Sequence, residues 1–81
     1  MRVRLYGRSE CHLCDQARDQ LLAIRAAGAE FEIDEVNIES DARLLRRYLE
    51  RIPVVEIEGV IVSELVLDVD AVRARLDTVS R

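Results

Sequence analysis

The fold of this chain is decided by the stretch Leu5-Tyr6-Gly7-Arg8-Ser9-Glu10-Cys11-His12-Leu13-Cys14. Val3 and Leu5 alternate with polar neighbours as in a short strand, and Gly7 ends that pattern. From Cys11 onward the apolar spacing becomes helical. The apolar residues of this predicted helix share one face, and they are Cys14, Ala17, Leu21 and Ile24. The two cysteines of the chain therefore lie where a strand gives way to a helix.

A second strand and a second helix are predicted after this unit. Gly28 suits the left-handed turn that ends a helix, and residues 31–38 then have the apolar content of a strand. The apolar positions change parity at Asp34-Glu35, which indicates either a bulge or a shortened strand. Ser40 is a suitable N-cap for the next helix. We expect that helix to bury one stripe, formed by Leu44, Leu45, Tyr48 and Leu49.

The last third of the chain predicts a hairpin and a closing helix. Pro53 ends the second helix and opens a strand over 54–57, and Glu58-Gly59 is a two-residue turn signal before a strand over 60–62. Asp68 is placed to cap the final helix. The apolar face expected there comprises Leu65, Val69, Val72, Leu76 and Val79.

This order, β-α-β-α-β-β-α, predicts one α/β domain over residues 1–81, with a four-stranded mixed sheet flanked by three helices. The first two strands should be parallel because a crossover helix separates them, and the hairpin strands should be antiparallel.

Composition excludes several classes of function. The chain has 81 residues, of which 49% are hydrophobic and 35% charged, so it is too apolar for disorder. No apolar run approaches the roughly 20 residues of a membrane span. A net charge of −4 argues against nucleic acid or a membrane as partner. Arginines interrupt the N-terminal stretch where a signal peptide needs an apolar run, so we expect a cytoplasmic location. We also expect a monomer.

In a reducing compartment a lone Cys-x-x-Cys pair indicates catalysis or metal binding rather than a structural disulfide. Cys11 should lie at the helix N-terminus, where free N–H groups stabilise a thiolate and thiol pKa values fall to roughly 3.5–7.5. Cys14 lies one turn further along and should be more buried. We therefore expect Cys11 to attack a disulfide and Cys14 to resolve the mixed disulfide. Arg8 and a protonated His12 would favour the thiolate, whereas Glu10 and Asp15 would oppose it.

Two other interpretations of the cysteine pair stay open. The pair could hold a soft metal such as zinc or copper, although tetrahedral zinc needs four ligands and His12 is the only histidine. The chain could also be a non-catalytic adaptor. No resident metal or cofactor is expected in either the enzyme or the adaptor.

Pro53 is the second candidate site residue. It could simply end a helix, or it could form a cis bond with Ile52, a geometry found in about 5–6% of such bonds. A cis bond beside the cysteines would turn the N–H and C=O of Ile52 outward, toward an extended substrate.

The stretch 5–14, together with Arg51-Ile52-Pro53-Val54-Val55 before a hairpin, resembles the glutaredoxin-like branch of the thioredoxin superfamily, and small bacterial members in particular. The resemblance implies a thiol-disulfide oxidoreductase that reduces protein or small-molecule disulfides. It assigns Cys11 as nucleophile and Cys14 as resolving cysteine, and it implies a cis peptide bond at Pro53.

The resemblance also bears on glutathione. Arg8 stands where glutaredoxins usually have a lysine that meets a glutathione carboxylate, and arginine can clamp a carboxylate well. Two departures count against glutathione: His12-Leu13 lies between the cysteines, and Ser63-Glu64 replaces a Gly-Gly turn. Ser63 could still donate a hydrogen bond to a substrate. Either glutathione or a thioredoxin-reductase-type partner could regenerate the dithiol.

Overall fold

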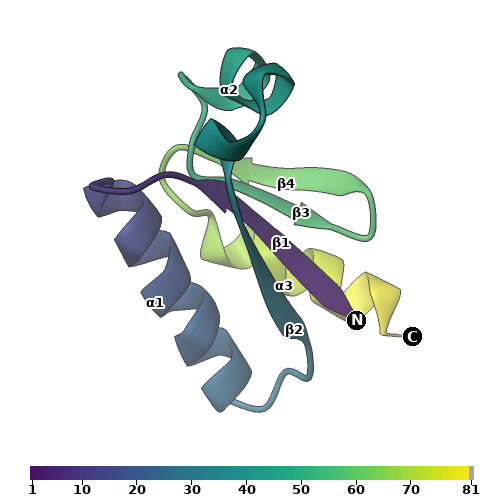
Figure 1. The fold of residues 1–81 in the computed structure, drawn as a ribbon. Helices are drawn as coiled ribbons and strands as arrows, with labels where there is room; N and C mark the ends of the chain where they lie inside the picture. Colours follow the sequence, from purple (N-terminus) through teal and green to yellow (C-terminus); the bar gives the residue numbers. More distant parts are fainter. Residues whose placement is uncertain (81) are drawn as a thin grey trace.

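The computed structural model describes residues 1–80, and its elements follow the predicted order with one short 3-10 helix added (Figure 1). None of the helices within residues 1–80 is both long and apolar enough to cross a membrane. The elements in chain order are β1 (Arg2–Gly7), α1 (His12–Ala26), β2 (Glu32–Asn37), η1 (Ile38–Ser40), α2 (Ala42–Tyr48), β3 (Val54–Ile57), β4 (Val60–Glu64) and α3 (Val69–Val79).

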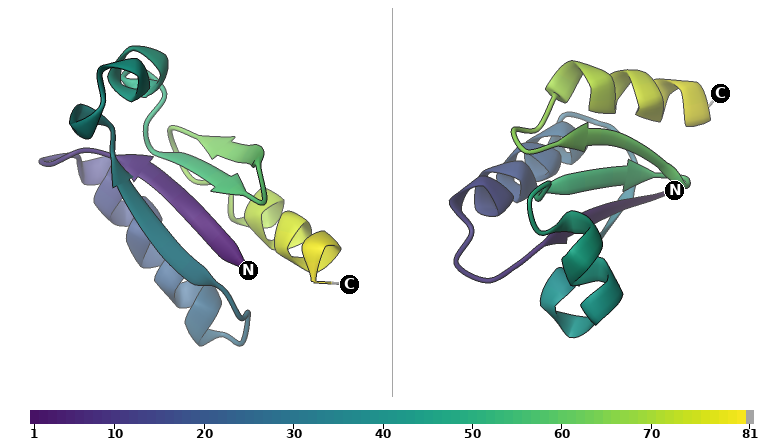
Figure 2. Two further views of the ribbon diagram at one scale, coloured as in Figure 1. Left: turned by 45° about the vertical axis from the view of Figure 1, so that its right-hand side comes forward. Right: turned by 90° about the horizontal axis from the view of Figure 1, so that it is seen from above.

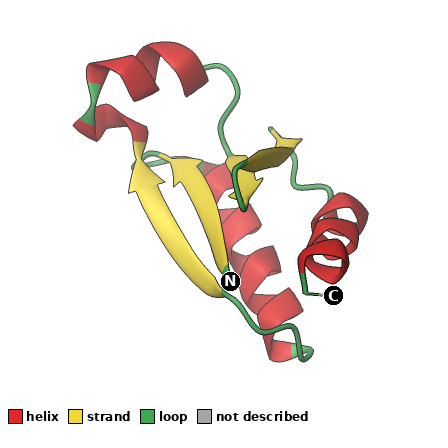
Figure 3. Ribbon diagram, turned by 90° about the vertical axis from the view of Figure 1, so that its right-hand side faces the viewer, coloured by secondary structure: helices red, strands yellow, loops and turns green. Residues whose placement is uncertain are grey.

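The strands form one mixed sheet in the order β2-β1-β3-β4. β1 runs parallel to β2 and antiparallel to β3, and β3 pairs with β4 as an antiparallel hairpin. Helices lie on both sides of the sheet, and the view from above shows α2 and α3 on opposite sides of the strands (Figures 2 and 3). The expected mixed sheet of four strands with three flanking α-helices is therefore confirmed.

Two separate apolar cores cover the two faces of this sheet. Val3 and Leu5 of β1 pack into the core beneath α1 and α3 (the α3-side core), whereas Tyr6 points to the other face and packs with Tyr48 of α2 in the α2-side core. Alternate side chains of one strand thus serve different cores, as the two-residue period of a strand requires. On the face of Tyr6 only the end of β1 is covered, since Arg2 and Arg4 share the parity of Tyr6 and are charged.

This arrangement explains the parity change in β2. Ile33 packs against the core beneath α1 and α3, and Val36 packs against the core beneath α2. The ladder between β1 and β2 is continuous from the Arg2–Glu32 pair to the Gly7–Asn37 pair. A bulge in this strand was therefore the wrong alternative, and the strand is shorter than the predicted 31–38.

The irregular strand pairing lies in the β3–β4 hairpin and not in β2. Its register shifts beside Val55 and Glu56, and β4 extends to Glu64 rather than ending at residue 62. Glu58 and Gly59 have φ angles of 50° and 80°, the two positive values that a type I′ turn requires. The predicted two-residue turn is confirmed.

The helix ends confirm some capping predictions and correct one. Gly28 follows α1 with φ +121°, and the side chain of Asp68 caps α3 by accepting the Ala71 N–H at 3.0 Å. Ser40 does not cap α2, because it ends η1. Asp41 is the N-cap of α2, and its carboxylate accepts the Arg43 N–H at 2.7 Å.

Two leucines expected in buried stripes are exposed. Leu49 is the C-cap of α2, still in helical conformation with its N–H bonded to the Leu45 carbonyl, but it is 44% exposed. Leu65 lies in the connection between β4 and α3, outside the final helix, and is 50% exposed. The predicted stripe of α1 is buried throughout, and Leu67 takes a place in the α3-side core that the sequence pattern did not assign.

Charged pairs lie across the strands of the sheet. Arg2 meets Glu32 at 3.7 Å, and Arg4 meets Asp34 at 3.4 Å and Glu56 at 3.7 Å. Each pair joins residues that stand opposite each other in the strand ladders. Such pairs add little stability individually, but a shifted register would place unmatched residues opposite one another.

We predict that Leu21→Ala lowers the free energy of unfolding by about 2–5 kcal/mol, because Leu21 is fully buried between α1 and the sheet. Leu22→Ala on the same helix is the matched control, since Leu22 is 39% exposed and leaves a much smaller cavity. Urea denaturation measures both values. Equal losses in the two variants would contradict the assignment of the α1 core face.

Candidate active site

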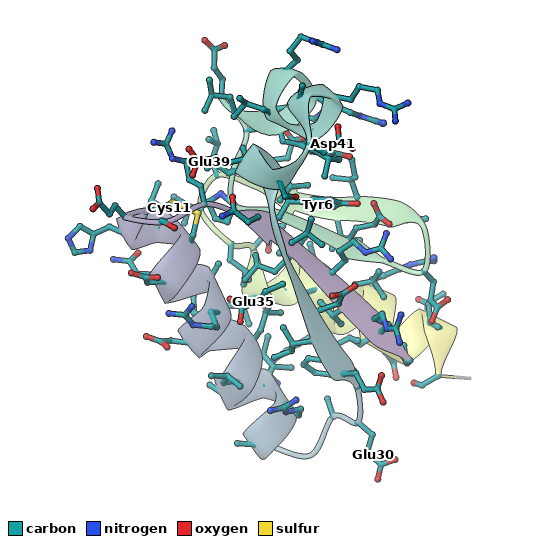
Figure 4. All side chains as sticks on the ribbon, viewed as in Figure 1. Tyr6, Cys11, Glu30, Glu35, Glu39 and Asp41 are labelled. Carbon is teal, nitrogen blue, oxygen red and sulfur yellow. A yellow bond between two sulfur atoms is a disulfide. The ribbon has the colours of Figure 1, made fainter. Side chains whose placement is uncertain are left out.

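Cys11 is the N-cap residue of α1, and Figure 4 shows it at the start of that helix. Its sulfur accepts the N–H of Cys14 at 3.2 Å, and its carbonyl accepts the N–H of Asp15 at 3.1 Å. The sulfur therefore receives a hydrogen bond from the free N–H groups of a helix start, as the sequence predicted. Cys11 and Cys14 form a disulfide, with their Cα atoms 5.2 Å apart.

The two cysteines differ in burial. Cys14 is only 6% exposed and packs in the α2-side core, whereas Cys11 is half-buried at the edge of that core. Gly7 favours this close packing, because a Cβ at position 7 would lie 3.1 Å from the Sγ of Cys14. A side chain at the end of β1 would therefore push Cys14 outward by a few tenths of an ångström.

The peptide bond between Ile52 and Pro53 is cis, as the resemblance implied. The side chain of Ile52 packs in the same core as Cys14, so the proline segment lies beside the cysteines. The N–H of Ile52 does not point outward, because it donates to the carbonyl of Tyr48 at 3.0 Å. Pro53 is fully buried and Ile52 is only 9% exposed, so both lie beneath the surface near the dithiol.

Arg51 connects three segments around the cysteine pair. Its N–H donates to the Tyr48 carbonyl at 2.8 Å, and its own carbonyl accepts the Leu65 N–H at 3.0 Å. Its guanidinium donates from Nε and Nη2 to the two carboxylate oxygens of Glu64, each at 2.8 Å. This bidentate pair holds the pKa of Glu64 below its usual range and raises the pKa of Arg51. The proline segment and the connection after β4 are thereby joined.

The buried ring of Tyr48 packs against Tyr6 and against the Arg51 guanidinium. It is 2% exposed, stacks on Tyr6 with a centroid distance of 4.6 Å, and has the Arg51 guanidinium carbon 5.2 Å from its centroid. Arg47 approaches the ring at 5.3 Å. Burial raises the pKa of Tyr6, whose hydroxyl donates to Glu56 at 3.2 Å. Contacts between aromatic rings thus connect β1 to the helix that precedes Pro53.

Ser63 has an internal role in the structure. It is 7% exposed, its hydroxyl accepts the Asp68 N–H at 2.9 Å, and the same hydroxyl donates to the Val66 carbonyl at 3.4 Å. These bonds shape the connection between β4 and α3. A hydrogen bond from Ser63 to a substrate would have to replace one of them.

Arg8 and His12 are exposed on either side of Cys11 along the chain. Arg8 borders a hollow of about 340 Å³ that Cys14 also borders. Within residues 1–80 Arg8 makes no salt bridge, whereas Arg18 in the same hollow pairs with Asp15 at 3.1 Å and with Glu35 at 3.2 Å. The structure thus leaves Arg8 as a cation available beside the dithiol.

Sequence reasoning missed the Arg51–Glu64 pair and the Tyr6–Tyr48 stack. Both pairs join segments that are distant along the chain, and neither follows a local spacing. The only signal was the excess of arginine around Pro53, which did not indicate a partner.

Comparison with known proteins places the chain in a family. The model of the family described as Glutaredoxin-like domain (DUF836) matches residues 2–77. The chain therefore belongs to this glutaredoxin-like family. No curated protein matches its sequence.

Solved structures agree with the family assignment. Protein Ne2328 from Nitrosomonas europaea is 30% identical with a TM-score of 0.82, and the alignment covers 91% of this chain and 88% of that protein. Target protein XcR50 from X. campestris is 36% identical with a TM-score of 0.72, over 94% of this chain and 96% of that one. Thioredoxin 1 from Thermosipho africanus TCF52B is 12% identical with a TM-score of 0.63 over 100% of both chains, which shows the shared thioredoxin fold alone. A glutaredoxin-like fold with its cysteine pair at disulfide distance is consistent with a redox role.

We predict that Glu64→Gln lowers the free energy of unfolding at neutral pH and that the loss disappears in acid. The pKa of Glu64 is lower in the folded protein than the ordinary value of 4.5. The unfolded state therefore binds more protons between the two pKa values, and the stability supplied by the Arg51 pair is lost as pH falls through the folded value.

Urea denaturation from about pH 3 to pH 7 measures this effect. Glu58→Gln is the matched control, because Glu58 is exposed and makes no salt bridge within the described residues 1–80. A gap between wild type and Glu64→Gln that stayed constant with pH would contradict the prediction.

Proposed function

We propose that this protein is a dithiol-disulfide oxidoreductase that reduces protein or small-molecule disulfides through Cys11 and Cys14. One observation carries the proposal. The half-buried sulfur of Cys11 receives an N–H at the start of α1, while Cys14 lies buried directly behind it. A nucleophile needs access and a stabilised thiolate, and a resolving thiol needs only to reach the nucleophile.

The reaction follows from this placement. The Cys11 thiolate attacks one sulfur of the substrate disulfide, forms a mixed disulfide and expels the other substrate sulfur as a thiolate, which takes up a proton. Cys14 then loses its proton and attacks the Sγ of Cys11. The second substrate thiolate leaves, and the Cys11–Cys14 disulfide remains. Two electrons have passed from the dithiol to the substrate.

A reductant must return those electrons. We propose glutathione or a thioredoxin-reductase-type partner, with the protein acting as a cytoplasmic monomer and without a resident cofactor. The exposed guanidinium of Arg8 supports glutathione as a reductant, because a free cation beside Cys11 can bind a carboxylate.

The expected outcome is a trapped mixed disulfide in one variant only. Cys14→Ser should accumulate a mixed disulfide on Cys11 when it is mixed with an oxidised substrate, because the resolving sulfur is absent. Cys11→Ser should form no adduct at a comparable rate, since Cys14 is 6% exposed. Intact-protein mass spectrometry measures both. Multiple turnover with a reductant should fall to background in Cys11→Ser.

Two outcomes would contradict the proposal. Equal rates of adduct formation in the two variants would exclude the assigned roles. Stoichiometric zinc or copper on the reduced wild-type protein, with no reduction of any disulfide, would favour a metal carrier instead.

A further inference from the structure

Three apolar side chains are exposed near the dithiol, and we call them the apolar rim: Leu13, Leu65 and Val66. Leu65 and Val66 are 50% and 69% exposed, the highest values for large apolar side chains within residues 1–80. Leu13 lies between the two cysteines and is 39% exposed. Isolated exposed leucines are ordinary, but a group of them beside a reactive centre indicates a contact surface.

The fold holds this rim beside the cysteines. The Leu65 N–H donates to the Arg51 carbonyl at 3.0 Å, so the connection after β4 lies against the segment that leads to Pro53. Ser63 donates to the Val66 carbonyl at 3.4 Å. Figures 1 and 2 both show this connection at the end of the sheet where α1 begins.

The backbone conformation at position 65 favours glycine rather than leucine. Leu65 has φ +62°, in the left-handed region that glycine adopts readily and that a branched side chain adopts at a cost. Half of its surface remains exposed, so core packing offsets little of that cost. An exposed apolar side chain kept on an unfavourable backbone indicates a role outside the fold.

The charges near the rim offer little to a substrate that carries several anionic groups. The guanidinium beside Ile52 and Pro53 is already neutralised, because Arg51 binds both carboxylate oxygens of Glu64. Glu10 is exposed immediately before Cys11. Within residues 1–80, Arg8 is the cation between β1 and α1 that makes no salt bridge. It can pair with one carboxylate, whereas glutathione disulfide carries four. A substrate with uncharged apolar side chains beside its disulfide would instead contact the apolar rim.

We propose that the apolar rim selects polypeptide disulfides whose cysteines are flanked by apolar side chains, in preference to glutathione disulfide. Leu65 and Val66 are the specificity-determining residues. The inference rests on the proposed function and uses the same exchange, in which two electrons pass from Cys11 and Cys14 to the substrate disulfide.

The experiment follows the oxidation of pre-reduced protein in a single turnover. Three oxidants are compared: a symmetric disulfide of a short peptide with leucine and valine beside its cysteine, the same peptide with serine at both positions, and glutathione disulfide. The wild-type protein should react with the apolar peptide about tenfold faster than with either of the others, since burying one such side chain is worth about that factor.

Variants then locate the preference. Leu65→Gly removes the side chain and suits the positive φ, so its fold should be retained, and Val66→Ser changes the other rim residue. Each should slow the reaction with the apolar peptide roughly three- to tenfold and leave the serine peptide unaffected. Val60→Ser is the matched control, because Val60 is 45% exposed at the opposite end of β4.

The outcomes separate this inference from the function on which it rests. Equal rates with the two peptides, a faster reaction with glutathione disulfide, or unchanged rates in Leu65→Gly and Val66→Ser would overturn the inference and leave the oxidoreductase intact. Failure of all three oxidants to form the Cys11–Cys14 disulfide would overturn the proposed function itself.

Discussion

Strand β1 carries the constraint on which the rest of the structure depends, because it is paired along both edges and packs into both cores. β2 and β3 take its hydrogen bonds, Val3 and Leu5 enter one core, and Tyr6 enters the other. Its last residue, Gly7, then allows Cys14 to pack against the sheet. The positions of α1, of α2 and of the dithiol are therefore all set by one six-residue strand.

The features that sequence predicted are those that repeat locally. The stripe of α1, the turn at Glu58-Gly59 and the cap at Asp68 depend on neighbours along the chain, and each is confirmed. The parity change in β2 was ambiguous because a strand shared by two cores and a bulged strand give the same pattern. Leu49 was misplaced because apolar character alone does not decide burial at the end of a helix.

In the candidate site, too, local features could be predicted from the sequence and long-range contacts could not. A helix start at Cys11 follows from local pattern, and the cis bond at Pro53 was implied by family resemblance rather than by spacing. The contacts that join these parts could not be predicted, because Arg51 and Glu64 lie on different segments that only the hairpin brings together. The sequence gives the net charge of the chain. It does not tell which arginines near the dithiol are already paired with carboxylates, and that pairing decides the charge a substrate meets.

The bond from the Leu65 N–H to the Arg51 carbonyl has a consequence for how such proteins diverge. It joins main-chain atoms, so it does not depend on which side chain stands at position 65. Substitutions there can change the outer surface while the connection stays joined to the segment that leads to the cis-proline. Under the proposed specificity, such substitutions would change which disulfides bind without moving Cys11 and Cys14.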